Sequence, residues 1–134
     1  MKSYTILFIV SVITIGCKSN PNVEAKSMVK YNYYDGNGNG FTLTSNSLAY
    51  DPITKEMSSS GIYSGGSKKT ISIKREQYES IEKLLIEAIA NKNIHLKNRP
   101  KGSGMIKSPS EKVVIRNGDE KNKIEAELRA LLKN

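Results

Sequence analysis

The sequence predicts a single α+β domain over residues 28–134, with an antiparallel sheet of about five strands and two helices packed on one face. Apolar and polar residues alternate in several short stretches, which is typical of half-buried strands. After Arg75 and again after Asp119, apolar residues instead recur every third or fourth position, as in amphipathic helices. The resulting order is β-β-β-α-β-β-α. Because no cysteine follows Cys17, packing and hydrogen bonds alone must hold this domain together.

The first two strands are predicted on either side of a glycine-rich turn. In the first, Val29, Tyr31 and Tyr33 alternate with Lys30, Asn32 and Tyr34. In the second, the apolar residues Phe41 and Leu43 stand at odd-numbered positions, whereas Leu48 and Tyr50 stand at even-numbered ones. We therefore expect a bulge or break between Thr44 and Ser47. Pro52 ends this strand because proline has no amide donor for the ladder.

A third strand and a helix complete the first half of the domain. Residues 58–69 form a glycine- and serine-rich connector, and the third strand follows with Ile71 and Ile73 in alternation. The helix is predicted from Arg75 to about Asn91. Its apolar face consists of Tyr78, Ile81, Leu84, Leu85, Ala88 and Ile89.

The second half repeats the layout of strands followed by a helix. Residues 93–96 predict a short extended segment, and residues 99–104 a loop. Residues 105–107 and 112–116 predict a hairpin, since Pro109 stands between them at a turn position that suits its fixed φ. Asp119 is the expected cap of a final helix with an apolar stripe of Ile124, Leu128, Leu131 and Leu132.

The turn between the first two strands lies in the stretch YDGNGNGF, residues 34–41. Asp35, Asn37 and Asn39 match the first half of an EF-hand calcium loop, but the twelfth position is Asn46, where a bidentate glutamate is needed. The flanking segments also alternate as strands. We therefore predict a turn, not a metal site, with either Asp35 or Tyr33 opposite Phe41 so that the apolar residues share one face.

Residues 1–17 have the layout of an export signal. Lys2 precedes an apolar run of twelve residues, from Tyr4 to Ile15, which is shorter than the roughly 18 residues of a membrane-spanning helix. The run ends in Thr14, Ile15, Gly16 and Cys17, which resemble the lipobox of bacterial lipoproteins, with Thr14 where leucine is commonest and Ile15 where a small residue is usual.

The resemblance implies that residues 1–16 are removed as a signal peptide. Cys17 would then carry a covalent diacylglycerol and an N-acyl chain, and residues 17–27 would be a flexible tether to the membrane. Several acyl chains, at about 0.8 kcal/mol per buried methylene, make such anchoring essentially permanent. The alternatives are an ordinary signal peptide that leaves a free thiol, and a retained anchor. Each of these readings places the domain outside the cytoplasm. The lipidated form would lie in the bacterial cell envelope, at either the inner or the outer membrane.

The chain is basic, with a formal net charge of +8. Basic proteins often bind nucleic acid, but export makes that partner an unexpected one here. Anionic headgroups, an acidic envelope polymer or an envelope protein are the partners that we consider instead. The lysines are scattered, so the charge is equally explained by a surface that tolerates lysine.

Residues for catalysis are scarce. His95 is the only histidine and stands between Ile94 and Leu96, a pattern that predicts a surface position if its neighbours face the core. No carboxylate pair or nucleophile motif accompanies it, so the sequence predicts a protein that is not an enzyme and has no cofactor beyond the lipid.

An interaction surface is the remaining expectation. Exposed tyrosines provide amphipathic contact points, and glycine-rich loops bring the backbone close to a ligand. The candidates are Tyr34, Tyr50, Tyr63, Gly65, Gly66 and Lys101. The leading prediction is therefore a small lipid-anchored envelope protein with a non-catalytic binding or structural role. An inhibitor or immunity-type lipoprotein that neutralises an envelope enzyme is the alternative, followed by a hydrolase acting on envelope polymers.

Overall fold

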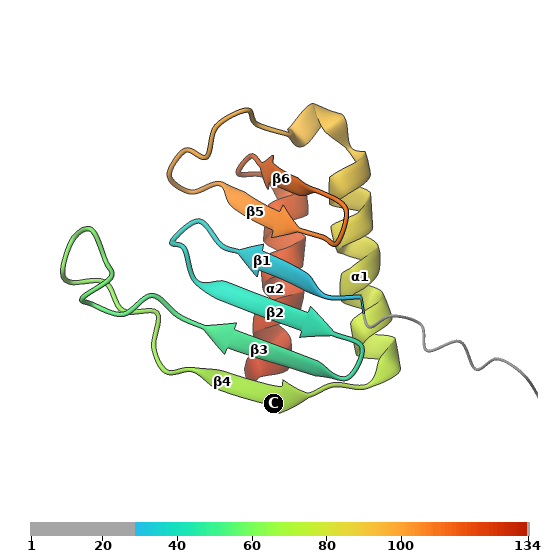
Figure 1. Cartoon of the computed structure of the whole chain (residues 1–134), viewed down its shortest axis with the longest axis horizontal. Coiled ribbons are helices and arrows are strands. Elements are labelled where there is room, and N and C mark those ends of the chain that lie inside the picture. The colour runs from blue at the N-terminus through green and yellow to red at the C-terminus, as the bar shows by residue number, and fades with distance from the viewer. Residues whose placement is uncertain (1–28, 134) are drawn as a thin grey trace, which may run out of the picture.

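The structure, a computed structural model, describes residues 29–133, so the predicted signal peptide, Cys17 and the tether lie outside the described residues. The domain is α+β, as predicted, and its elements are shown in Figure 1. In chain order they are β1 (Tyr31–Tyr34), β2 (Gly40–Thr44), β3 (Ser47–Asp51), β4 (Lys69–Ser72), α1 (Arg75–Ala90), the 3-10 turn η1 (Lys92–Ile94), β5 (Gly104–Lys107), β6 (Lys112–Ile115) and α2 (Asp119–Lys133). Within residues 29–133 the strands form one antiparallel sheet of six, in the order β4-β3-β2-β1-β5-β6.

The sheet has six strands, not about five, because the predicted second strand is a hairpin. Residues 45 and 46 form a tight turn between β2 and β3, with Thr44 paired to Ser47. Across a two-residue turn, the residue numbers of two paired residues add to an odd number. The buried side chains therefore change from odd-numbered positions in one strand to even-numbered positions in the next. The parity switch that we interpreted as a bulge or break is this turn. Thr44 Oγ1 stabilises it by accepting from the Ser47 amide, at 3.1 Å.

Of the two registers expected for β1 and β2, the structure has the one with Tyr33 opposite Phe41. Tyr33 pairs with Phe41 and Tyr34 with Gly40, so residues 35–39 form a five-residue loop. Tyr31, Tyr33, Phe41 and Leu43 consequently face one side of the sheet and are all buried, as the alternation predicted.

Both helices cover one face of the sheet and run across the strands, as Figure 1 shows. The helix faces predicted from periodicity are the buried ones, because each supplies side chains to the same core. The most deeply buried apolar side chains are Tyr33, Phe41, Leu43, Leu48, Ile81, Leu85, Ile94, Ile106, Ile115, Ile124 and Leu128. The opposite face of the sheet is not covered by these helices.

The segment after α1 differs from the extended stretch expected at residues 93–96. It begins as the 3-10 turn η1, and only His95 and Leu96 lie beside β6. The Leu96 amide donates to the Val114 carbonyl at 2.8 Å, and the Arg116 amide to the Ile94 carbonyl at 2.9 Å. His95 is half-buried, and its Nε2 donates to the Ala88 carbonyl at 3.0 Å, near the end of α1. This bond joins the segment after α1 to the end of that helix.

The two ends of the sheet differ. One end carries the short turn at 45–46, the turn at 108–111 and the start of β1; we call it the hairpin end. The other end carries residues 35–39, 52–68 and 97–103, and we call these three segments the loop end (Figure 1). Among residues 29–133, no helix has the length and apolar character needed to cross a membrane.

Candidate functional site

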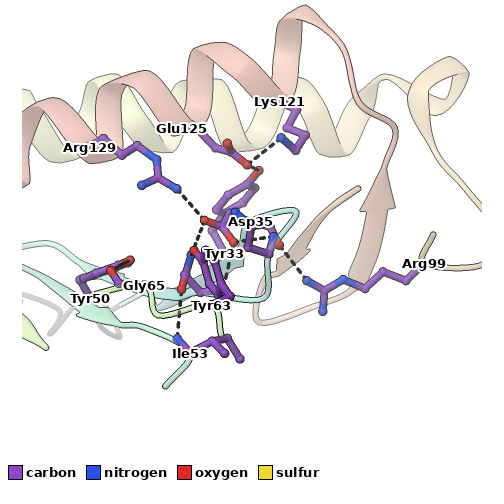
Figure 2. Close-up of polar contacts among 12 residues, drawn as sticks. Tyr33, Asp35, Tyr50, Ile53, Tyr63, Gly65, Arg99, Lys121, Glu125 and Arg129 are labelled. Carbon is purple, nitrogen blue, oxygen red and sulfur yellow. Dashed lines mark hydrogen bonds and ion pairs between the residues drawn. The ribbon is translucent and has the colours of Figure 1, made fainter. Parts of the chain in front are cut away.

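The loop end is organised around Asp35, whose side chain is almost completely buried. Its Oδ1 accepts from the backbone amides of Asn37 and Asn39, both at 2.9 Å. Its Oδ2 accepts from Asn39 Nδ2 at 2.8 Å and from Arg129 Nη2 on α2 at 2.6 Å (Figure 2). A buried carboxylate is stable only when it is paired and hydrogen-bonded, and four donors meet that requirement here.

Asn39 connects this turn to the long loop at 52–68. It is fully buried, and its Nδ2 also donates to the hydroxyl of Tyr63 at 2.7 Å. Its Oδ1 accepts from the Ile53 amide at 3.0 Å. The loop is closed by the Gly65 amide, which donates to the Ile53 carbonyl at 2.9 Å, and by the Tyr50 hydroxyl, which donates to the Gly65 carbonyl at 2.8 Å.

The loop at 97–103 joins the same turn from the other side. Arg99 Nη2 donates to the Asp35 carbonyl at 3.0 Å (Figure 2). The Gly102 amide donates to the Gly36 carbonyl at 3.3 Å. Both the 52–68 loop and the 97–103 loop are thus tied to residues 35–39. We call the bonds made by Asp35, Asn39 and Arg129 the Asp35 network.

Two glycines allow the loops to approach this closely. A Cβ on Gly36 would lie 2.8 Å from the Gly102 Cα, and one on Gly65 would lie 2.1 Å from Asn39 Oδ1. Either contact is shorter than packed atoms allow, so a side chain would separate the loops. Gly36, within the stretch 34–41, therefore serves loop packing as well as turn formation.

The calcium-like spacing of Asp35, Asn37 and Asn39 is explained by the Asp35 network. Both carboxylate oxygens of Asp35 are occupied by N–H donors, and the amide of Asn39 is buried between Asp35, Tyr63 and Ile53. Asn37 is exposed. Asp and Asn at this spacing satisfy the backbone of a turn through their own side chains, which is the structure seen here. Within residues 29–133, no three His, Cys, Asp or Glu side chains gather closely enough to hold a metal ion.

A second buried polar group lies between β1 and α2. The Tyr33 hydroxyl donates to Glu125 Oε1 at 2.9 Å, and Lys121 Nζ pairs with the same oxygen at 3.0 Å (Figure 2). Gly104 leaves room for the phenol, since a Cβ there would lie 2.6 Å from the Tyr33 hydroxyl. Burial and the neighbouring Glu125 raise the pKa of Tyr33, so this phenol remains a donor at neutral pH.

The candidate surface residues fall into three places. Tyr34 lies on the open sheet face, with the cations of Arg99 and Lys107 over its ring at 5.8 and 5.2 Å. Tyr50 faces the helices, packs on Phe41 with 4.9 Å between ring centroids, and holds the 52–68 loop through its hydroxyl. The remaining four candidates lie at the loop end: Tyr63, Gly65, Gly66 and Lys101.

Tyr63 and Lys101 line the same groove, which has a volume of about 510 Å³. The groove lies between the 35–39 turn, the 52–68 loop and the 97–103 loop. Its other walls include Asn37, Ile53, Met57 and the serines at 58–60. Met57 in this wall is 69% exposed and Ile62, outside the lining, is 80% exposed, which is unusual for large apolar side chains. Gly66 is exposed with φ +98°, and Gly65 is half-buried beneath the loop.

A smaller cavity of about 270 Å³ lies between the end of α1 and the start of α2. Glu87 and Glu120 line it together with Lys123 and Asn91. Glu87 is also 3.9 Å from Lys83, and Glu120 accepts from Asn91 Nδ2 at 3.4 Å, so both carboxylates have partners on the helices.

Comparisons of the chain with protein-family models, with curated protein sequences and with solved structures find no match. The long-range partners of the site were also absent from the sequence prediction. Asp35 and Asn39 were noted for their spacing, but Arg99, Arg129 and Glu125 carry no local signal, because each reaches the site from an element distant in the sequence.

Proposed function

We propose that this protein is a non-catalytic binding module of the bacterial cell envelope, anchored by lipid on Cys17, with the loop end as its ligand-binding surface. The observation that carries the proposal is the Asp35 network, which ties two irregular loops, 52–68 and 97–103, and the helix α2 to one turn. Binding residues are commonly presented on loops that a rigid scaffold positions. Loops that are ordered before binding also lose less conformational entropy when a ligand arrives.

The direction of β1 sets how the domain would be oriented by the proposed anchor. Tyr31 begins β1 and pairs with Leu43 beside the turn at 45–46, so the chain enters the domain at the hairpin end. The proposed tether at 17–27 would therefore attach at the hairpin end. With ten or so flexible residues spanning roughly 17 Å on average, it would keep that end near the bilayer and leave the loop end facing away.

The experiment is an affinity purification from membranes with the full chain as bait. An envelope component should be retained by the wild type and lost from Ile62→Asp, which places a charge on the loop end. Ile86→Asp is the matched control, because Ile86 is a 50% exposed apolar residue on α1, outside the loop end. Equal retention by both variants would remove the loop end as the binding surface.

A second function, that of an inhibitor or immunity-type lipoprotein, is favoured by the shape of the 52–68 loop. This loop projects beyond the sheet in Figure 1 and carries both Met57 and Ile62. A projecting apolar loop is suited to a concave site on another protein. Retention of one enzyme in a fixed ratio, with loss of its activity in the complex, would select this function over the general one.

The hydrolase alternative would have to use the cavity between the helices. Glu87 and Glu120 are its two carboxylates, and Glu120→Gln is the variant that would stop acid-base chemistry there. The loop end does not support a hydrolase, because carboxylates are absent from the groove lining among residues 29–133.

A further inference from the structure

We propose that the groove at the loop end binds an acidic saccharide, with the carboxylate of a sugar acid placed at Lys101. The proposal rests on the proposed function and names the class of ligand for the same surface. Its basis is the size of the groove, its charge and the kinds of side chain that line it.

The size of the groove fits a small ligand or a short part of a polymer. Its volume of about 510 Å³ lies within the range of roughly 300–1,000 Å³ that is common for such sites. Because three loops form its walls, it is open to solvent along one side of the domain. An extended glycan could place one or two units in it without threading through the protein.

The charge of the groove favours an anion. Lys101 is the cation in its lining, and carboxylates are absent from that lining among the described residues. The neighbouring Glu56 lies outside the lining. Within residues 29–133, the Lys101 ammonium forms neither an ion pair nor a side-chain hydrogen bond, so it is available for a ligand carboxylate. A charge-assisted bond of this kind is about twice as strong as a neutral one.

The other side chains favour a sugar over a simple anion. Tyr63 is held in one orientation because its hydroxyl accepts from Asn39 Nδ2 at 2.7 Å. A fixed aromatic ring offers an apolar surface for the C–H face of a pyranose. The hydroxyl of Ser59 and the side-chain amide of Asn37 supply donors and acceptors that match the hydroxyls at the sugar edge.

The test is a calorimetric titration of the full chain with a short oligouronate and with the same oligosaccharide after its carboxyl groups have been reduced to alcohols. The oligouronate should bind at least about tenfold more tightly than its reduced form. Lys101→Gln should abolish that difference. Lys112→Gln, at the exposed start of β6 on the hairpin end, should leave it unchanged although it removes the same charge.

A second pair of variants tests the groove independently of Lys101. Ser59 is exposed and lines the groove, and its side chain makes no hydrogen bond among the described residues. Ser59→Asp places a carboxylate where the ligand would lie and should weaken oligouronate binding by about tenfold or more, whereas Ser59→Asn, of the same size, should retain it.

The proposal would be overturned by equal binding of the reduced oligosaccharide or by binding unaffected by Ser59→Asp. It would also be overturned by an equal loss in Lys112→Gln, which would indicate attraction to the general basic charge. Complete displacement by millimolar inorganic phosphate would also overturn it, because the groove would then recognise any anion. If these results occur while Ile62→Asp still loses an envelope component, the ligand class is wrong and the loop-end function stands. If every loop-end variant keeps both oligouronate binding and retention of the envelope component, the ligand class and the loop-end function are both wrong.

Discussion

The carboxylate of Asp35 lies 2.6 Å from the guanidinium of Arg129, a residue 94 positions later in the chain. The Asp35 side chain is 2% exposed and that of Arg129 is 44% exposed, so the pair spans the boundary between the interior and solvent. Through this contact the first loop of the sheet is fixed to the last helix. The arrangement of the loop end therefore depends on complete folding of the domain, including its C-terminal element.

Replacing Asp35 by Asn is expected to lower the free energy of unfolding by about 2–4 kcal/mol. The new amide nitrogen would face Asn39 Nδ2 and Arg129, which are both donors, so buried donors would lose their acceptor. Urea unfolding followed by circular dichroism measures the change. Asp51→Asn is the control: its ion pair with Lys68 is largely exposed, and we expect a change within about 0.5 kcal/mol. Equal losses in both variants would contradict a special role for Asp35.

Stability at alkaline pH should depend on Tyr33. Burial and Glu125 raise its pKa in the folded protein above the ordinary value of 10.0. The phenol therefore ionises in the unfolded chain first, so its contribution is complete below about pH 10 and is lost as the pH rises further. Urea midpoints measured from pH 8 to pH 11 should fall less steeply in Tyr33→Phe than in the wild type. Parallel curves for the two proteins would contradict this prediction.

Tyr78 is expected to contribute to the same alkaline loss at a second site. Its hydroxyl donates to Glu82 Oε1 at 2.6 Å, and burial together with Glu82 raises its pKa. Tyr33 and Tyr78 have different carboxylate partners. The decrease in the slope of urea midpoint against pH that each of Tyr33→Phe and Tyr78→Phe causes should therefore be additive in the double variant. A double variant no flatter than either single one would show that the two phenols are coupled.

Gly65→Ala is expected to separate the 52–68 loop from the turn and to destabilise the protein by about 1–3 kcal/mol. The cause is the 2.1 Å approach of a Cβ to Asn39 Oδ1. Faster hydrogen exchange at the Ile53 amide, which donates to that oxygen, would report the local opening. Gly118→Ala is the control, because the nearest atom to a Cβ there is 3.9 Å away. Unchanged exchange at Ile53 in Gly65→Ala would contradict the prediction.

Cys17→Ala is expected to release the protein from the membrane fraction and to prevent incorporation of labelled fatty acid. The expectation rests on the lipobox-like residues 14–17. Each buried methylene contributes about 0.8 kcal/mol to anchoring, so removing the acyl chains removes the main membrane contact. Fractionation of cells and autoradiography provide the measurements. Label in the variant, or its continued sedimentation with membranes, would contradict lipidation at Cys17.

The elements that could be predicted from the sequence are those with a local physical signal. Ile81 and Leu85 recur at the helical period, and Tyr31 and Tyr33 alternate, so α1 and β1 were expected where they occur. The β2–β3 hairpin was missed because residues 45 and 46 are Ser and Asn, without the glycine that usually marks a two-residue turn. Its parity switch was seen but assigned to a bulge or break within one strand.

The candidate site could be predicted only in part, for a different reason. Tyr63 and Lys101 were selected as surface residues, but nothing in the sequence places two loops 38 positions apart around one groove. Asp35 was noticed as half of a metal motif. Its actual partners, Arg99 and Arg129, are ordinary basic residues until the fold brings them to the turn, so only the tertiary structure shows the charge to be buried and paired.

The way in which the turn holds its neighbours has a consequence for engineering. The 52–68 and 97–103 loops are joined to residues 35–39 largely through backbone groups, such as the Ile53 amide, the Gly65 carbonyl and the Gly102 amide. The side chains of Ser59, Ile62 and Lys101 make none of these bonds, so they can be randomised while the backbone geometry is kept, whereas the hydroxyls of Ser58 and Ser60 accept from backbone amides of the loop and would be retained. The domain is in this sense a ready framework for libraries, in which new specificities could be selected without rebuilding the fold.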